Sequence, residues 1–316
     1  MSINKPGITM LMVAGALLVA APAFAQGDLG TGQGRAVVTV LAKQTGGTPA
    51  SVSQQNVSIK VNGKPSIITS WTPLNGPNNS VELVILIDGA ARTSLGTQLD
   101  DIRHFVNSLP PNAKAAIAYM MNGRAVFAGP LSANHEQVLS ALHLPAGATG
   151  VTASPYFCLS DLAQNWPSGN RGARRVVVMV TDGVDAYDLR FDPDDPYVQA
   201  AIKDSAKAGL VVYSIYWMNR GLIDLSRYQN NASQSLLLEV TDATGGKSYW
   251  QGTGNPVSFQ PYFEDLLRRL ANQYEINFSA QLNGKPTLET MKLKVDAPAI
   301  NVTAPQQVFV DHAGGE

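Results

Sequence analysis

The sequence predicts an α/β fold: a doubly wound, mostly parallel six-stranded sheet with a small antiparallel β-sandwich beside it. Residues 81–87 and 176–180 are almost entirely aliphatic, and they lead to Asp88 and Asp182. A short apolar run without alternation is typical of a strand that is covered on both faces. In addition, strand and helix patterns alternate through residues 80–272, which is typical of a parallel sheet with helices on both faces.

Within that region each element has a local signal. Helices are expected where apolar residues recur at helical spacing, and strands where short apolar runs end at glycine, proline or asparagine. Asn122-Gly123 joins two strands as a hairpin, which adds an antiparallel strand at the edge of the sheet. The expected strands are 81–87, 115–120, 124–128, 174–182, 210–216 and 247–250, and the expected helices are 95–109, 132–142, 155–166, 197–208, 233–244 and 256–271.

Both ends of the chain are rich in short strands with one polar face. Because a few strands alone rarely form a stable body, we expect residues 35–72 and 273–316 to pair into one antiparallel sandwich. In the N-terminal segment, residues 26–79, the Gly-rich stretch 26–34 is expected to be a flexible lead-in and 73–79 a linker. The sandwich would thus be built from the two ends of the chain.

The first residues predict export. Residues 1–25 contain Lys5, an apolar run over 8–19, and small residues at the positions before a cleavage site after Ala25. This pattern is typical of a secretory signal peptide. A membrane anchor is the alternative, but the run is short for a span and Pro22 follows it. We therefore expect a secreted or periplasmic protein with no membrane span after cleavage.

Composition argues against several classes of function. The formal net charge is −1, which gives no electrostatic case for binding nucleic acid or an anionic membrane. Cys158 is the only cysteine, so no internal disulfide forms, and its apolar surroundings predict a buried, inert thiol. The four histidines, His104, His135, His143 and His312, are scattered, and no catalytic motif accompanies them. We expect no enzymatic activity.

Four motifs follow one another in residues 80–272. They are a buried strand that ends at Asp88, an antiparallel hairpin, a threonine-bearing loop before a helix, and Thr181-Asp182-Gly183 after the fourth strand. This ordered set resembles a von Willebrand factor type A domain. The flanking segments 56–65 and 282–285 are similar to those of secreted von Willebrand type A-related proteins typical of Acidobacteria. The resemblance covers the whole mature chain and implies a protein-binding role.

The resemblance also implies a site at the carboxyl edge of the sheet, where that family usually holds a divalent cation. Such a site needs Asp-x-Ser-x-Ser after the first strand, a threonine in the second loop and an aspartate in the third, because Mg²⁺ prefers oxygen ligands. Asp88, Thr152 and Asp182 match, but Ala90 and Arg92 replace the serines. We therefore expect no tightly bound metal, with Mg²⁺ as the alternative. The Arg92 guanidinium is expected to pair with Asp88 or Asp182 in its place.

Two features of this site have alternatives. Thr149 is the other candidate for the position given to Thr152. Asp88 and Asp182 would also be explained if they capped the N-termini of helices.

An acidic loop follows Asp182. Its aspartates are Asp185, Asp188, Asp192, Asp194 and Asp195. A Ca²⁺ loop or a docking surface is one interpretation, but a solvated loop with Asx-turns and a helix cap at Asp195 is favoured. Five aromatic residues are expected in loops or at strand ends near the same rim, namely Tyr187, Tyr197, Tyr216, Trp217 and Tyr228. Aromatic residues with polar tips suit an interface, and some of the five are expected to serve ordinary packing instead.

These expectations combine into one hypothesis. The chain is expected to be a non-enzymatic, adhesion-type module that binds a protein or an extracellular matrix component. The rim residues would be Asp88, Arg92, Thr152 and Asp182. The alternative is a structural scaffold of an envelope complex that uses an edge strand of the β-sandwich.

Overall fold

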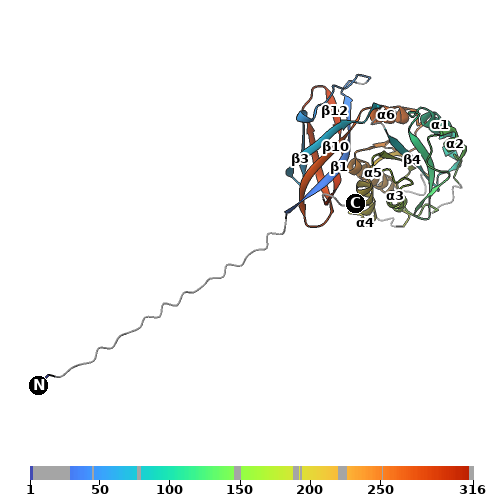
Figure 1. The fold of residues 1–316 in the computed structure, drawn as a ribbon. Coiled ribbons are helices and arrows are strands. Elements are labelled where there is room, and N and C mark those ends of the chain that lie inside the picture. Colours follow the sequence, from blue (N-terminus) through green and yellow to red (C-terminus); the bar gives the residue numbers. More distant parts are fainter. Residues whose placement is uncertain are drawn as a thin grey trace.

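The computed structural model describes residues 1–2, 29–44, 46–76, 80–145, 151–187, 192, 194–219, 226–250 and 252–312. Most of the expected signal peptide, Thr149 and Asp188 therefore lie outside the described residues. Two bodies lie side by side, an all-β body from the two ends of the chain and an α/β body from its middle (Figure 1). Within the described part, no helix is both long and apolar enough to cross a membrane.

The α/β body contains a six-stranded sheet in the order β6-β5-β4-β7-β8-β9. Its strands are β4 (Val81–Asp88), β5 (Lys114–Met121), β6 (Arg124–Phe127), β7 (Arg174–Thr181), β8 (Leu210–Tyr216) and β9 (Lys247–Tyr249). Only β6 pairs antiparallel in this sheet, after the turn at Asn122-Gly123. Every residue of β4 is buried, as its unbroken aliphatic run predicts. The predicted mostly parallel six-stranded sheet is confirmed.

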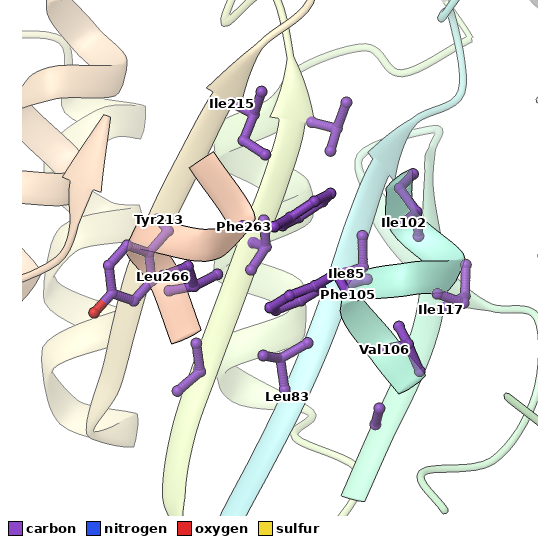
Figure 2. Packing of buried hydrophobic residues seen from close by; sticks show 14 of the residues in the cluster. Leu83, Ile85, Ile102, Phe105, Val106, Ile117, Tyr213, Ile215, Phe263 and Leu266 are labelled. Carbon is purple, nitrogen blue, oxygen red and sulfur yellow. The ribbon is translucent and has the colours of Figure 1, made fainter. Parts of the chain in front are cut away.

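Helices cover both faces of this sheet (Figure 1). One face carries α1 (Leu99–Asn107), α2 (His135–Ser140) and α6 (Gln260–Leu270), and the other carries α3 (Pro155–Gln164), α4 (Pro196–Ala208) and α5 (Arg227–Thr244). Figure 2 shows Leu83 and Ile85 of β4 facing Phe105 of α1 and Phe263 of α6. The two rings stack with their centroids 4.3 Å apart. The next residues along β4 point to the opposite face, as strand geometry requires.

Four helices, α1, α2, α5 and α6, begin three or more residues from where they are expected. The expected helix 95–109 is a 3₁₀ helix, η3 (Thr93–Gln98), followed by α1. Helix α5 begins well before residue 233 because Ser226 and Gln229 form a capping box. The Ser226 hydroxyl accepts the Gln229 N–H at 3.2 Å, and the Gln229 side chain accepts the Ser226 N–H at 3.0 Å. The capping box thus starts α5 before the apolar residues from which the start at residue 233 was expected.

The all-β body pairs strands from both ends of the chain. Its strands are β1 (Leu29–Ala42), β2 (Val57–Val61), β3 (Lys64–Pro73), β10 (Gln273–Asn283), β11 (Thr287–Val295), β12 (Ile300–Thr303) and β13 (Gln307–His312), with a short 3₁₀ helix η1 (Gln54–Asn56) before β2. They are antiparallel in the order β10-β3-β2-β11-β13-β1-β12, and β10 also pairs with β1. The predicted pairing of the two ends is confirmed, and this closure makes it a six-stranded barrel with β12 added at its side.

The Gly-rich lead-in is part of this barrel, so the expectation of a flexible segment over 26–34 is wrong for the residues described. Residues 29–34 lie in β1 and pair with β10. A Cβ at Gly34 would come within 2.3 Å of the Phe278 ring, and one at Gly32 within 2.5 Å of Val310. These glycines make room for large core side chains of the neighbouring strands. A Gly-rich segment that serves packing in this way has the same composition as a flexible linker.

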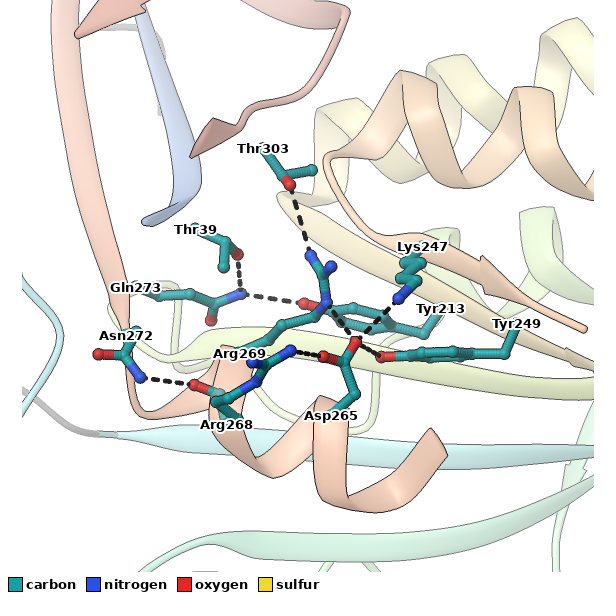
Figure 3. A network of polar contacts seen from close by, with 10 residues as sticks. All are labelled: Thr39, Tyr213, Lys247, Tyr249, Asp265, Arg268, Arg269, Asn272, Gln273 and Thr303. Atoms are coloured by element: carbon teal, nitrogen blue, oxygen red, sulfur yellow. Dashed lines mark hydrogen bonds and ion pairs between the residues drawn. The ribbon is translucent and has the colours of Figure 1, made fainter. Parts of the chain in front are cut away.

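A buried polar network joins the two bodies (Figure 3). The side chain of Gln273 donates to Thr39 Oγ1 at 3.0 Å and to Tyr213 Oη at 3.1 Å. Arg174 donates to Gln273 Oε1 at 2.6 Å and to the Leu270 carbonyl at 2.7 Å. Burial lowers the pKa of the Arg174 guanidinium to about 10. Separating the two bodies would leave buried polar groups without partners, which is costly.

Asp265 on α6 organises the cations of this network. It accepts Arg269 Nε at 2.8 Å and Lys247 Nζ at 3.1 Å, and also a hydrogen bond from Arg268 (Figure 3). Burial alone would raise the pKa of Asp265, but the hydrogen bonds from Arg269, Arg268 and Lys247 outweigh it and hold the pKa well below its usual range. Arg269 also reaches Thr303 Oγ1 at 3.4 Å, so α6 is tied to β12 of the barrel.

Candidate functional site

The candidate site lies at the carboxyl edge of the six-stranded sheet, where β4 and β7 end side by side. Ile87 of β4 pairs in parallel register with Val180 of β7. The loops that begin at Asp88 and after Thr181 therefore leave the sheet next to each other. Asp88 is the last residue of β4, Asp182 directly follows β7, and the two are only 2% and 3% exposed. This edge is the usual location of sites in open α/β sheets.

Asp88 is held by three hydrogen bonds. Its Oδ2 accepts the Thr181 hydroxyl at 2.6 Å, and its Oδ1 accepts the Thr152 hydroxyl and the Ala90 N–H, the latter at 2.9 Å. Both threonines are buried. Because hydrogen bonds to a carboxylate are strong, Asp88 ties the segments around these three residues together. We call this arrangement the Asp88 lock.

Glycine follows both strands at positions where no side chain fits. A Cβ on Gly89 would lie 2.3 Å from the carbonyl oxygen of Met120. Gly183 has a φ of 71°, and a Cβ there would lie 2.6 Å from Leu237. These two loops therefore leave the sheet by tight, close-packed turns that only glycine permits.

Asp182 organises the third loop through the backbone. Its Oδ1 accepts the Val184 N–H at 3.0 Å and its Oδ2 accepts the Asn219 N–H at 3.3 Å. Asn219 is 6% exposed, and its side-chain oxygen has no hydrogen-bond partner in the described part of the chain. Asp182 therefore connects the loops that follow β7 and β8.

The alternative in which both aspartates cap helices is wrong. The residue at the N-cap of η3 is Arg92, and the residue at the N-cap of α4 is Asp195. Asp88 and Asp182 each accept an N–H two residues ahead instead, which is an Asx-turn.

The second loop is joined to the third by another hydrogen bond. The Thr152 carbonyl accepts the N–H groups of Gly123 at 3.0 Å and of Ser154 at 2.9 Å. Ser154 caps α3, and its hydroxyl donates to Asp185 Oδ2 at 2.9 Å. The structure thus places Thr152 directly against Asp88, with its loop fixed on both sides.

Several carboxylates lie near Tyr156 at this edge. Tyr156 is fully buried and donates to the Gly183 carbonyl at 3.0 Å. Burial raises its pKa well above the usual value, and nearby carboxylates add to the shift. These carboxylates belong to Asp185, Asp195, Asp182 and Glu239. Burial, together with Asp88, also raises the pKa of the Cys158 thiol, which agrees with a buried, unreactive cysteine.

The first loop does not supply the oxygen ligands that a metal site needs. Ala90 offers a methyl group, and Arg92 an exposed guanidinium. In the described structure Asp88 accepts hydrogen bonds from the Thr152 and Thr181 hydroxyls and from the Ala90 N–H. Among the described residues, no group of three or more His, Cys, Asp or Glu side chains is arranged to hold a metal ion. The donor set does not fit tightly bound Mg²⁺, which demands octahedral oxygen coordination.

The five aromatic residues expected at the rim do not share one role. Tyr216 and Trp217 are buried, so they are the members of the set that serve ordinary packing. Tyr216 donates to the Asn230 side chain, and Trp217 packs edge to face on Phe259 with centroids 5.4 Å apart. Tyr228 lies in α5 and is 64% exposed.

The two remaining tyrosines form an aromatic cluster with Phe157, a residue not included in the expected rim. The ring centroids of Phe157 and Tyr197 are 4.6 Å apart, and those of Phe157 and Tyr187 are 5.4 Å apart. Tyr187 and Tyr197 are separated by 5.8 Å. All three contacts are edge to face, so the rings hold one another in place.

The acidic loop contains the expected helix cap and an Asx-turn where it is described, but Asp185 and Asp195 are buried and not solvated. Asp195 caps α4 by accepting the N–H groups of Tyr197 at 2.8 Å and Val198 at 3.3 Å. Asp192 accepts the Asp194 N–H at 2.9 Å in an Asx-turn.

Sequence reasoning missed the structural importance of Thr181 and Ser154. Thr181 was noted only as part of a motif, although it donates the 2.6 Å hydrogen bond to Asp88. Aligning the ends of β4 and β7 in register would have placed it beside Asp88. Ser154 precedes Pro155 at the start of α3, which is a typical N-cap signal.

No protein-family model matches the sequence, and no curated protein matches it. Among solved structures, an aerotolerance-related membrane protein from Bacteroides fragilis NCTC 9343 is 14% identical with a TM-score of 0.41, over 60% of this chain and 98% of that chain. The proximal thread matrix protein 1 of the mussel byssus, with a zinc-occupied MIDAS motif, is 13% identical with a TM-score of 0.42, over 61% of this chain and 47% of that chain. The SpRpn10 VWA domain is 16% identical with a TM-score of 0.37, over 53% of this chain and 85% of that chain. The functional argument therefore comes from the site itself.

Proposed function

We propose that this chain is a secreted or periplasmic von Willebrand type A protein that binds another protein or a matrix component and catalyses no reaction. The binding surface is the carboxyl edge of the six-stranded sheet. The observation that supports this proposal is the Asp88 lock, which fixes loops from three parts of the chain beside an exposed arginine, Arg92. Loops that are fixed before a partner arrives lose little entropy on binding.

Binding is proposed to be independent of metal. Where the resemblance implies serine ligands, the chain has Ala90 and Arg92. Arg92 supplies a permanent positive charge that a partner carboxylate can engage directly. The adhesion site is therefore a degenerate form of the metal-ion-dependent type, with the guanidinium in the role of the cation.

The experiment is capture of proteins from the envelope and culture-supernatant fractions of the source organism, identified by mass spectrometry. Arg92→Glu reverses the charge at the rim and is expected to abolish capture of the specific partner. Lys285→Glu is the matched control, because Lys285 is exposed on the hairpin between β10 and β11 of the barrel. Identical capture by the wild type and both variants would refute binding through the rim.

A scaffold role through the barrel edge remains the second candidate, and one observation favours it. Strand β12 stands at the end of the strand order and pairs with β1. Val302 on this strand is 36% exposed. An edge strand of this kind can accept a strand from a partner. In that case Val302→Lys, and not Arg92→Glu, is expected to abolish capture.

A further inference from the structure

The aromatic cluster presents a ring surface beside the candidate site. Tyr187 is 68% exposed, while Phe157 and Tyr197 are half-buried beneath and beside it. Large aromatic side chains with one polar end are enriched at protein interfaces. The cluster therefore has the composition of a recognition surface.

The rings are positioned in advance by their backbones. The Tyr187 N–H donates to Asp185 Oδ1 at 2.8 Å, and Asp185 is itself held by Ser154. The Tyr197 N–H donates to the helix cap Asp195 at 2.8 Å. A ligand that stacks on Tyr187 would therefore meet a ring whose backbone is already fixed, which reduces the entropy lost on binding.

The charge around the cluster selects among ligands. Residues 182–195 contain six aspartates and one arginine, so the segment is strongly acidic. Asp192 and Asp194 are exposed immediately before α4, and Tyr197 lies in the first turn of that helix. A cation gains both from the face of an aromatic ring and from nearby carboxylates, whereas a neutral ligand gains only from the ring.

We propose that the aromatic cluster binds a partner segment that presents an arginine or lysine side chain to the ring of Tyr187. Asp192 and Asp194 supply the opposite charge. This inference rests on the proposed function, because it names the chemistry of a second contact made by the same partner. Arg92 and the cluster differ in charge, so the two contacts recognise different groups on the partner.

The test uses a short fluorescein-labelled peptide of repeating glycine, serine and arginine, with matched peptides in which glutamate or proline replaces arginine. Fluorescence anisotropy measures their binding to the mature protein. The arginine peptide is expected to bind. Tyr187→Ala is expected to weaken its affinity about three- to ten-fold, because the variant loses one exposed cation–π contact and the packing of the ring. Tyr187→Phe keeps the ring face and should bind within about two-fold of the wild type.

Tyr228→Ala removes another exposed tyrosine and should leave peptide binding unchanged. Asp194→Asn should weaken binding, and added salt should weaken it further. Equal binding by Tyr187→Ala and the wild type would overturn the proposal. So would failure of the arginine peptide to bind, or equal binding of the proline peptide. If Arg92→Glu leaves capture intact while the peptide results hold, only the rim proposal fails; the reverse pattern refutes only the cationic ligand.

Discussion

Thr181→Val tests the Asp88 lock, because valine keeps the shape of threonine and removes its hydroxyl. Thr181 is fully buried, donates to Asp88 Oδ2 at 2.6 Å and accepts the Gly183 N–H at 3.1 Å. The substitution removes a hydrogen bond to a charged group, which is worth about 1.5–3 kcal/mol. It also leaves a buried backbone N–H without its acceptor, at a further cost of about 1 kcal/mol or more.

The added methyl group recovers less than about 1 kcal/mol by apolar burial. We therefore expect the free energy of unfolding to fall by about 2–4 kcal/mol. For a protein of this size, that corresponds to a decrease in melting temperature of roughly 3–7 °C. Thermal unfolding of the mature protein, followed by circular dichroism, measures it.

Two controls make this result specific to the lock. Thr181→Ser retains the hydroxyl and should recover most of the stability. Thr69→Val makes the same chemical change on an exposed position of β3 and should shift the melting temperature little. A Thr181→Val protein as stable as the wild type would show that the hydroxyl contributes nothing and that the lock is an incidental contact.

Two further predictions concern charge. Asp265→Asn leaves Lys247 and Arg269 without their carboxylate, so the free energy of unfolding, measured with urea at pH 7, should fall by about 2–3 kcal/mol. Asp100→Asn is the control: the Asp100 side chain is 94% exposed, so the free energy of unfolding should change by less than about 0.5 kcal/mol. Because folding lowers the pKa of Asp265, its carboxylate stabilises the folded state at pH values above its ordinary pKa of about 3.9, and this stabilisation is lost as the pH falls below that value. A stability difference between the wild type and Asp265→Asn that stays constant into acid would contradict this prediction. Calorimetric titration of Mg²⁺ into the mature protein should show no binding, and an affinity in the micromolar range would refute the metal-independent site.

Much of the fold could be predicted because its signals are local and repeated. The run from Val81 to Ile87 has one consistent explanation, a strand covered on both faces, and all of β4 is buried. The pairing of the chain ends followed from a physical need, since neither flank alone has enough strands to bury an apolar face. The closure of that sheet into a barrel depends on the register of β1 with β10, which composition does not specify.

The site was less predictable because its contacts join distant parts of the chain. Thr152 and Asp88 are far apart in sequence, and nothing local to either encodes their hydrogen bond. Tyr216 and Trp217 lie at the carboxyl end of β8, which is where a rim residue would also lie. Their side chains are nevertheless buried in the core. Position along the chain identified the correct edge of the sheet, while the direction of each side chain depended on tertiary packing.

The Asp88 lock also limits what this edge can recognise. A carboxylate has about four acceptor positions, and Asp88 uses three of them within the protein. A partner would therefore meet the residues that the lock positions, Arg92 on the first loop and Tyr187 on the third, and not Asp88 itself. Loss of the lock should reduce stability and binding together, because the loops lose their common support. Loss of Tyr187, which is exposed, should reduce binding with little change in stability. Measuring stability and binding on the same variants thus separates the residues that build the edge from those that contact a partner.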